Sequence, residues 1–167
     1  RFADEQKKQL LDHFSPSQVR KQNEHEQEIK ELEMEVFNAK IPGFFPTPLP
    51  LIERMIALSS LKASDRVLEP SAGKVERHST LVKILILKGY NFVGSDFLAY
   101  QPEKKYDKII MNPPFENGQD IDHVSHALNL LKPGGRVVAI MGEGAFFRQF
   151  KKDTNFRELL KEKNAYI

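Results

Sequence analysis

The stretch KIIMNPPF, residues 108–115, decides how the fold of this chain is interpreted. Its first half has the length and mostly apolar composition of a short buried strand. The two prolines that follow have no amide hydrogen to donate, so a central strand cannot continue through them. The stretch therefore predicts a strand at 108–111, with the side chain of Asn112 at its carboxyl end.

Working outward, apolar strand-like runs alternate with segments of helical periodicity. Helices are expected at 51–61, 80–88, 121–131 and 155–163, and strands at 66–69, 91–93, 108–111 and 136–141. Continuous apolar strands that alternate with helices are typical of a parallel sheet covered on both faces. The sequence therefore predicts a doubly wound, mostly parallel α/β domain, in which ligands bind beyond the carboxyl ends of the strands.

The first 40 residues differ from the rest. They contain no glycine and one proline, and they are rich in Glu, Gln and Lys. Ser15 is expected as the N-cap and Pro16 as the first residue of a helix, which Ile41-Pro42-Gly43 ends. The sparse apolar stripe of this helix either packs along the edge of the domain or binds a partner. We expect a helical extension at 1–40 and a catalytic domain at 41–167.

Composition narrows the class of protein. The chain has 167 residues, about one domain, and is 40% hydrophobic and 29% charged. It has no cysteine, which excludes disulfides and thiolate metal sites and fits a reducing, cytoplasmic location. No apolar run approaches the roughly 18 residues of a membrane span. Residues 41–167 hold 18 basic and 14 acidic side chains, an excess that permits contact with a polyanion.

Four segments fall at or beside the expected strand ends. In order they are FFPTP at 44–48, LEPSAG at 68–73, GSDF at 94–97 and NPPF at 112–115. Together, over residues 41 to about 150, they resemble the S-adenosylmethionine-dependent N6-adenine DNA methyltransferases, amino-methyltransferases with an Asn-Pro-Pro-Phe motif. The resemblance implies a class I, Rossmann-like methyltransferase fold and a methyl group transferred to an exocyclic amino nitrogen.

The NPPF segment carries the expected chemistry. The lone pair of an adenine amino group is delocalised into the ring, so the nitrogen is a poor nucleophile. Two acceptors, the Asn112 side chain and the Pro113 carbonyl, can hold both amino hydrogens, while Pro114 helps to fix the backbone. Phe115 offers a face for stacking on a base that the family flips out of duplex DNA. The alternative is a plain proline turn at the end of a strand.

The resemblance also implies a cofactor site for S-adenosylmethionine. Its expected residues lie in all four segments: Phe45, Thr47, Glu69, Pro70, Ser71, Ala72, Gly73, Asp96, Phe97 and Asn112. Small residues after the first strand let the backbone approach the cofactor, and Asp96 would accept a hydrogen bond from its adenine. Each segment also has a simpler interpretation. These are a proline-rich linker at 44–48, an ordinary turn after Leu68, and Asp96 as the cap of the next turn.

One spacing departs from the family. Val75-Glu76 would suit a second strand that ends in the acid that binds the ribose of the cofactor, but Glu76 lies only three positions after Gly73. A parallel crossover needs at least about 10–12 residues. Either Glu76 is not the ribose-binding acid, or residues are missing after Lys74. We favour the omission.

Further candidates are weaker. Phe146 and Phe147 follow the last strand and either contact the target base or pack in the core. His123 and His126 share a helical face, but no third ligand is evident, so we expect solvated histidines and no metal site. The expected partner is duplex DNA, with sequence read by a recognition domain beyond Ile167 or by another chain. Rival acceptors are an amino group in RNA and a glutamine amide in protein. A non-catalytic methyltransferase-like subunit is the alternative from another class.

Overall fold

The structure is a computed structural model that describes residues 16–39, 47–70, 79–91, 94 and 96–167. The chain divides into two compact units. One comprises Arg1–Pro42 and His78–Val93, and the other comprises Gly43–Arg77 and Gly94–Ile167. Two expected strands lie outside the described residues. They are the strand at 91–93, of which only Asn91 is described, and the strand at Val75-Glu76. The same is true of the junction after Lys74.

The first unit pairs two helices, α2 (Pro16–Asn38) and α4 (Ser79–Leu87). Val36 of α2 and Ile84 of α4 are buried, and Lys83 forms an ion pair with Glu28 at 2.9 Å. The ring of His25 also hydrogen-bonds through Nε2 to the carbonyl of Leu87 at 2.8 Å. The apolar stripe of α2 therefore packs against α4 in part, and Pro16 is the first helical residue, as predicted.

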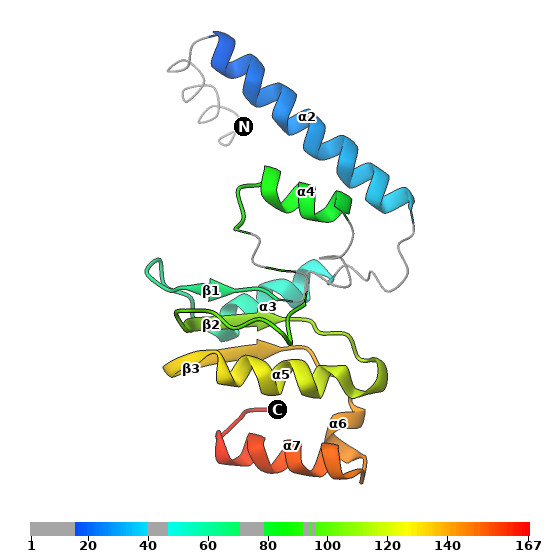
Figure 1. Cartoon of the computed structure of the whole chain (residues 1–167), viewed down its shortest axis with the longest axis vertical. Helices are drawn as coiled ribbons and strands as arrows, with labels where there is room; N and C mark the ends of the chain where they lie inside the picture. The colour runs from blue at the N-terminus through cyan, green and yellow to red at the C-terminus, as the bar shows by residue number, and fades with distance from the viewer. Residues whose placement is uncertain (1–15, 40–46, 71–78, 92–93, 95) are drawn as a thin grey trace. The chain divides into compact units, whose positions relative to one another are not determined.

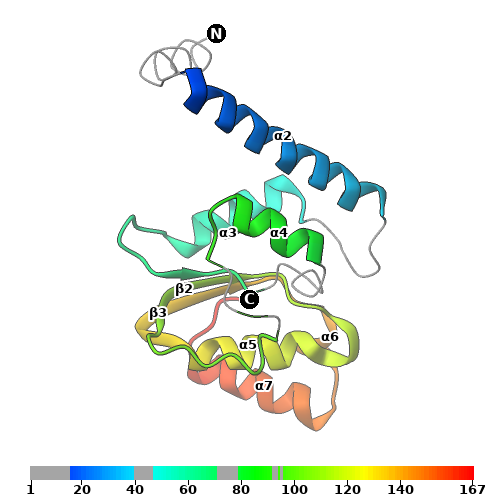
Figure 2. The same cartoon turned by 45° about the horizontal axis from the view of Figure 1, so that its top comes forward.

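The second unit contains the sheet. Its strands are β1 (Val67–Leu68), β2 (Tyr106–Met111) and β3 (Leu131–Ala139), paired in parallel in the order β1-β2-β3. Helix α3 (Leu49–Ser59) packs on one face and α5 (Gln119–Asn129) on the other, with α7 (Lys151–Glu162) outside α5 (Figures 1 and 2). This arrangement confirms the predicted α/β class and the parallel sheet, and is consistent with a Rossmann-like class I methyltransferase fold.

The core of this unit lies between the sheet and α5. Ile109 and Met111 of β2 are almost completely buried, as is Ala127 of α5, and Phe156 of α7 packs into the same cluster. These side chains lie on the inward stripe of each element, which explains why the apolar pattern of the sequence located the elements. Burial of one such large apolar side chain contributes about 1.5–3 kcal/mol.

The element boundaries differ from the expected ones where long-range pairing decides them. Helix α3 begins two residues before the expected start at Leu51, and α7 begins at Lys151 rather than at Asn155. Strand β3 begins at Leu131, which pairs with Tyr106, and residues 132–135 then bulge before pairing resumes at Arg136. Gly134 has φ +76° in this bulge, a conformation that favours glycine. Two short helices, η2 (Glu116–Gly118) and α6 (Gly144–Phe147), were not expected.

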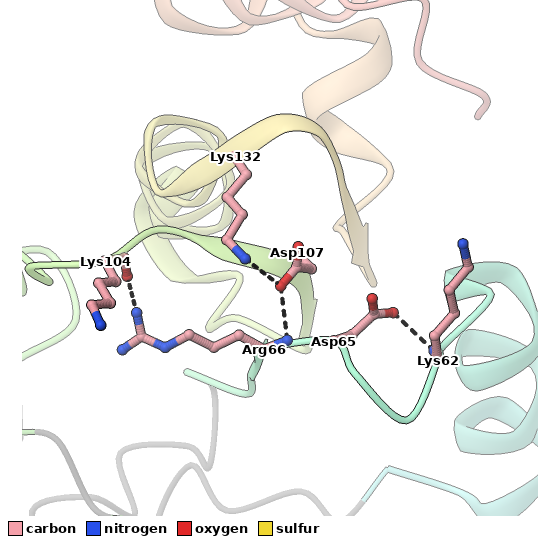
Figure 3. A network of polar contacts seen from close by, with 6 residues as sticks. All are labelled: Lys62, Asp65, Arg66, Lys104, Asp107 and Lys132. Atoms are coloured by element: carbon pink, nitrogen blue, oxygen red, sulfur yellow. Dashed lines mark hydrogen bonds and ion pairs between the residues drawn. The ribbon is translucent and has the colours of Figure 1, made fainter.

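A polar network ties the amino ends of the strands together (Figure 3). The carboxylate of Asp107 accepts a hydrogen bond of 2.8 Å from the Arg66 amide and one of 2.7 Å from the Lys132 ammonium. The Arg66 guanidinium donates to the Lys104 carbonyl and lies 4.3 Å from the centre of the Tyr106 ring. The bonds from Lys132 and Arg66 lower the pKa of Asp107 below its ordinary value. We assign this network at the amino ends of the strands a role in stability, because the candidate site lies at the carboxyl ends.

No helix in the described part of the chain has the length and apolar character needed to cross a membrane.

Candidate active site

Parallel pairing brings the ends of the three strands to one edge. Leu68 pairs with Ile109, and Met111 pairs with Ala139. The amide of Ile140 continues this ladder, donating to the Met111 carbonyl at 3.0 Å. The chain that leaves each strand therefore starts from the same edge, and it carries residues 69–70, 112–115 and 140–142. The edge is the one at which ligands bind in open parallel sheets.

Asn112 is held by a residue from far away in the sequence. Its side-chain nitrogen Nδ2 donates a hydrogen bond of 3.0 Å to Oγ1 of Thr47. Thr47 of the FFPTP segment is therefore in contact with Asn112 of the NPPF segment. The side-chain oxygen Oδ1 of Asn112 is buried and has no hydrogen-bond partner among the described residues.

An unpaired buried acceptor is costly. Leaving such a group unsatisfied disfavours the folded state by about 1–3 kcal/mol, and native proteins contain few of them. A ligand that donates an N–H or O–H to Asn112 Oδ1 would remove this cost. The atom therefore marks a position where a substrate group with an N–H or O–H could bind.

The rest of the NPPF segment combines a fixed base with an accessible ring. Pro113 is among the most completely buried residues, and Pro114 is partly buried. The Phe115 side chain is 48% exposed, so one part of the ring is free to contact a ligand. A rigid backbone below an exposed aromatic ring suits the stacking role expected for Phe115.

The expected cofactor residues have mixed surroundings. Pro70 is buried after β1, and Glu69 is exposed with interactions of its own. Asp96 accepts hydrogen bonds through Oδ1 from the amides of Leu98 at 3.0 Å and Ala99 at 3.3 Å. The capping role proposed for Asp96 is therefore present, and it occupies only one carboxylate oxygen. Five predicted residues lie outside the described part of the chain: Phe45, Ser71, Ala72, Gly73 and Glu76.

Phe97 and the two histidines form one cluster, in which Phe97 is buried and both histidines are partly buried. The Phe97 ring is 7% exposed and lies 5.4 Å from the ring of His123 and 4.9 Å from that of His126. His126 hydrogen-bonds through Nε2 to the Tyr100 carbonyl at 3.0 Å, and Nδ1 of His123 is buried with no partner among the described residues. Desolvation lowers the pKa of His123. The expectation of solvated histidines holds only in part, because both side chains are partly buried where their helical face packs against Phe97.

Phe146 and Phe147, the two candidates for contact with the target base, differ in their exposure to solvent. Phe146 packs against the core cluster, whereas Phe147 is 65% exposed. The core-packing alternative therefore holds for Phe146, and Phe147 alone keeps a free ring.

The sequence did not single out Asp120, which the structure places next to the site. Asp120 is 4% exposed, and its carboxylate accepts hydrogen bonds from the amides of Gly142 and Ile121, both at 3.0 Å. A signal was available, since an acidic residue in the first turn of a helix interacts favourably with the helix dipole. That signal does not indicate burial, which depends on the loop after β3.

The site fits S-adenosylmethionine at the residues that the structure describes. The hydroxyl of Thr47 can still donate while it accepts from Asn112. Asp96 has a second carboxylate oxygen that takes no part in its turn. These groups match a ligand that carries both amino and carboxylate groups.

Comparisons with known proteins identify the family of this chain. Malonyl-(acyl-carrier protein) O-methyltransferase 2 of Ilyobacter polytropus is 39% identical over 85 residues, which cover 47% of this chain and 29% of that protein. The chain thus spans less than a third of the length of this curated relative. The family profile described as "Methyltransferase small domain" matches residues 55–166, more than half of the chain. This family implies S-adenosylmethionine as the methyl donor. The chain belongs to the methyltransferase small domain family.

Proposed function

We propose that this chain is the catalytic domain of an S-adenosylmethionine-dependent methyltransferase that modifies the N6 amino group of adenine in DNA. The observation that carries the proposal is Oδ1 of Asn112, which is buried at the carboxyl edge of the sheet and has no hydrogen-bond partner in the described part of the chain. A hydrogen-bond acceptor in this position suits a substrate whose N–H group can donate to it.

The proposed chemistry addresses the low nucleophilicity of an aromatic amine. Its nitrogen lone pair is conjugated with the ring, and methyl transfer requires that pair to be localised on nitrogen. Hydrogen bonds from the two amino hydrogens to Asn112 Oδ1 and the Pro113 carbonyl favour the tetrahedral nitrogen. Because these bonds strengthen as positive charge develops on nitrogen, they stabilise the transition state more than the ground state.

The cofactor supplies an electrophilic methyl group. The nitrogen lone pair forms the new N–C bond while the C–S bond of the donor breaks, and the surplus proton then leaves the nitrogen for water. No strong general base is needed, since the proton becomes acidic only after the transfer. The part of this chain is to orient the amino group through Asn112 and to stack the ring on Phe115.

The curated relative, by its name, methylates an oxygen of a malonyl group carried by a protein. An ionised carboxylate has no hydrogen to donate, so it would leave Asn112 Oδ1 unpaired and place two acceptors against each other. That mismatch costs about 1–3 kcal/mol. The site therefore favours methyl transfer to an amino group over transfer to a carboxylate.

Several groups that could receive the methyl group have amino hydrogens to donate to Asn112. They are the amino groups of adenine and guanine and the side-chain amide of glutamine. The choice of adenine in DNA rests on the resemblance of the four segments, and on the FFPTP segment in particular. The Thr47–Asn112 hydrogen bond supports that resemblance, because it joins the first segment to the last. A non-catalytic binding subunit would not need an unpaired acceptor at this edge.

The test is transfer of a tritiated methyl group from S-adenosylmethionine to a panel of acceptors. The panel contains duplex DNA, RNA, a glutamine-bearing protein and malonyl-acyl-carrier protein. We expect label in DNA, recovered as N6-methyladenine after digestion. The matched control is the same duplex with purine in place of adenine, which lacks only the amino group and should take no label. Label confined to malonyl-acyl-carrier protein would overturn the proposal in favour of oxygen methylation.

A further inference from the structure

The carboxylate of Asp120 is buried although no cation pairs with it among the described residues. Asp120 is 4% exposed, and its two carboxylate oxygens accept from two different amides, Ile121 through Oδ1 and Gly142 through Oδ2. A buried charge is costly unless donors compensate it. Here the donors are two backbone amides and the amino-terminal end of α5.

The two amides belong to different elements. Ile121 is the next residue of α5, whereas Gly142 lies in the loop that follows β3, 22 positions along the chain. The bond to Ile121 is local and would orient the carboxylate. The bond to Gly142 holds the loop after β3 against the start of α5.

Gly142 in turn lies beside the aromatic residue of the site. A Cβ atom placed on Gly142 would be 3.8 Å from Cβ and 3.9 Å from Cγ of Phe115, and 3.4 Å from Oδ2 of Asp120. Gly142 therefore lies next to both the carboxylate and the base of the Phe115 side chain. Holding the Gly142 amide would keep this loop in place beside Phe115.

We propose that Asp120 is a positioning residue that fixes the Phe115 ring by holding the Gly142 amide. One part of this inference rests on the proposed function, namely that the Phe115 ring stacks on the target base. Its structural part, the coupling of Asp120 to Phe115 through Gly142, is independent of which acceptor is methylated.

The first experiment needs no substrate. Protein labelled with fluorophenylalanine is compared by fluorine NMR between the wild type and Asp120→Asn, with the Phe115 signal assigned from Phe115→Leu. Asparagine keeps one acceptor and loses the other, so we expect the Phe115 signal to shift or broaden. The Gly142 amide should also exchange with solvent roughly tenfold faster. An unchanged Phe115 signal together with unchanged Gly142 exchange would overturn the inference, whatever the substrate is.

The matched control is Asp153→Asn, which changes another buried carboxylate in the first turn of a helix. It should lower thermal stability without moving the Phe115 signal. If Asp120→Asn does not fold, Gly142→Ala approaches the same contact from the other side. The added methyl group fits at ordinary contact distance beside Phe115 and should move its signal while leaving the protein folded. A Phe115 signal unmoved in Gly142→Ala would also overturn the inference.

The second experiment measures function as a double-mutant cycle. In the wild-type background, Asp120→Asn should lower the methyl-transfer rate roughly tenfold with cofactor affinity unchanged. In the Phe115→Ala background the same change should have almost no further effect, because its target is gone. Equal losses in both backgrounds would overturn the coupling. Absence of adenine methylation by the wild type would instead reject the proposed function and leave the NMR result standing.

Discussion

The side-chain nitrogen of Asn112 donates a 3.0 Å hydrogen bond to the hydroxyl of Thr47, a residue 65 positions earlier in the chain. This bond fixes which way the Asn112 amide faces, because the nitrogen is bound on the Thr47 side. The oxygen then faces the opposite way, where it is buried and unpaired among the described residues. In the proposed mechanism Thr47 therefore orients the Asn112 oxygen without touching the nitrogen that is methylated.

Replacing Thr47 by valine should therefore impair catalysis. Valine keeps the shape but removes the acceptor of the Asn112 amide, which loses its fixed orientation. We expect methyl transfer to fall roughly tenfold, the equivalent of one lost hydrogen bond. Thr47→Ser keeps the hydroxyl and should stay near the wild-type rate. Single-turnover rates measure both variants, and a valine variant as fast as the serine variant would contradict the role.

Asp96 is expected to bind the adenine of the cofactor. Asp96→Ala should weaken S-adenosylmethionine binding by about 1–3 kcal/mol, measured by calorimetry. Because Oδ1 also caps the turn at Leu98 and Ala99, alanine removes two roles at once. Asp96→Asn keeps an oxygen for the turn and separates them. It should retain thermal stability and still lose affinity, because its NH₂ group replaces the oxygen that would accept from the adenine. Unchanged affinity in the alanine variant would count against the assignment.

The sequence predicted the parts of the fold that depend on local pattern. The run before Asn112 is a strand whose side chains are buried on one face of the sheet, at Ile109 and Met111, and partly buried on the other. The meeting of two strand ends also followed from the sequence, since parallel strands point the same way. Thr47 and Asn112 were both candidates, and the structure brings them within hydrogen-bond distance.

What the sequence missed depends on contacts between distant residues. Leu131 is in a strand only because Tyr106 pairs with it, and no local pattern predicts that register. His123 and His126 look solvated on a polar helix until Phe97 covers them. Asp120 gives a local signal for a helix start and none for burial. Each of these positions is decided by a tertiary neighbour rather than by propensity.

The pKa of Asp107 makes part of the stability depend on pH. Lys132 and the Arg66 amide lower it from its ordinary value of 3.8. A carboxyl group with a lowered pKa in the folded state stabilises that state above its ordinary pKa, and the contribution is lost as the pH falls through the folded value. Asp107→Asn should therefore lower Tm at neutral pH, and the difference from the wild type should shrink in acid.

Lys132→Met is the second variant of this test. Without the ammonium group the pKa of Asp107 should move back toward 3.8, so its stabilising effect should be lost at a higher pH than in the wild type. Thermal unfolding over a series of acidic buffers measures both variants. Curves that run parallel to the wild type at every pH would show that this network adds no pH-dependent stability.

Phe115→Ala should weaken the complex with an extruded base. Base–aromatic stacking contributes about 1–3 kcal/mol, and the ring is 48% exposed at the site. A fluorescent adenine analogue in duplex DNA brightens when it leaves the stack, so the variant should give a smaller increase. Phe115→Tyr keeps the ring and is the control. Phe147 is also exposed, and only a double variant removes any stacking that it supplies. Equal brightening in the double variant would rule out both rings.

Asn112→Ala tests the central assignment. The Oδ1 acceptor disappears, and with it the hydrogen bond that should strengthen as charge develops on the amino nitrogen. We expect the single-turnover rate to fall by orders of magnitude while calorimetry shows nearly wild-type cofactor affinity, because the lost interaction belongs to the transition state. Asn112→Asp should be milder. A carboxylate still accepts from the amino group, and the Thr47 hydroxyl can turn to donate to it. Methylation of adenine by Asn112→Ala at the wild-type rate would remove Asn112 from the mechanism. The fold and the family would stand, and the unpaired oxygen would then need another ligand.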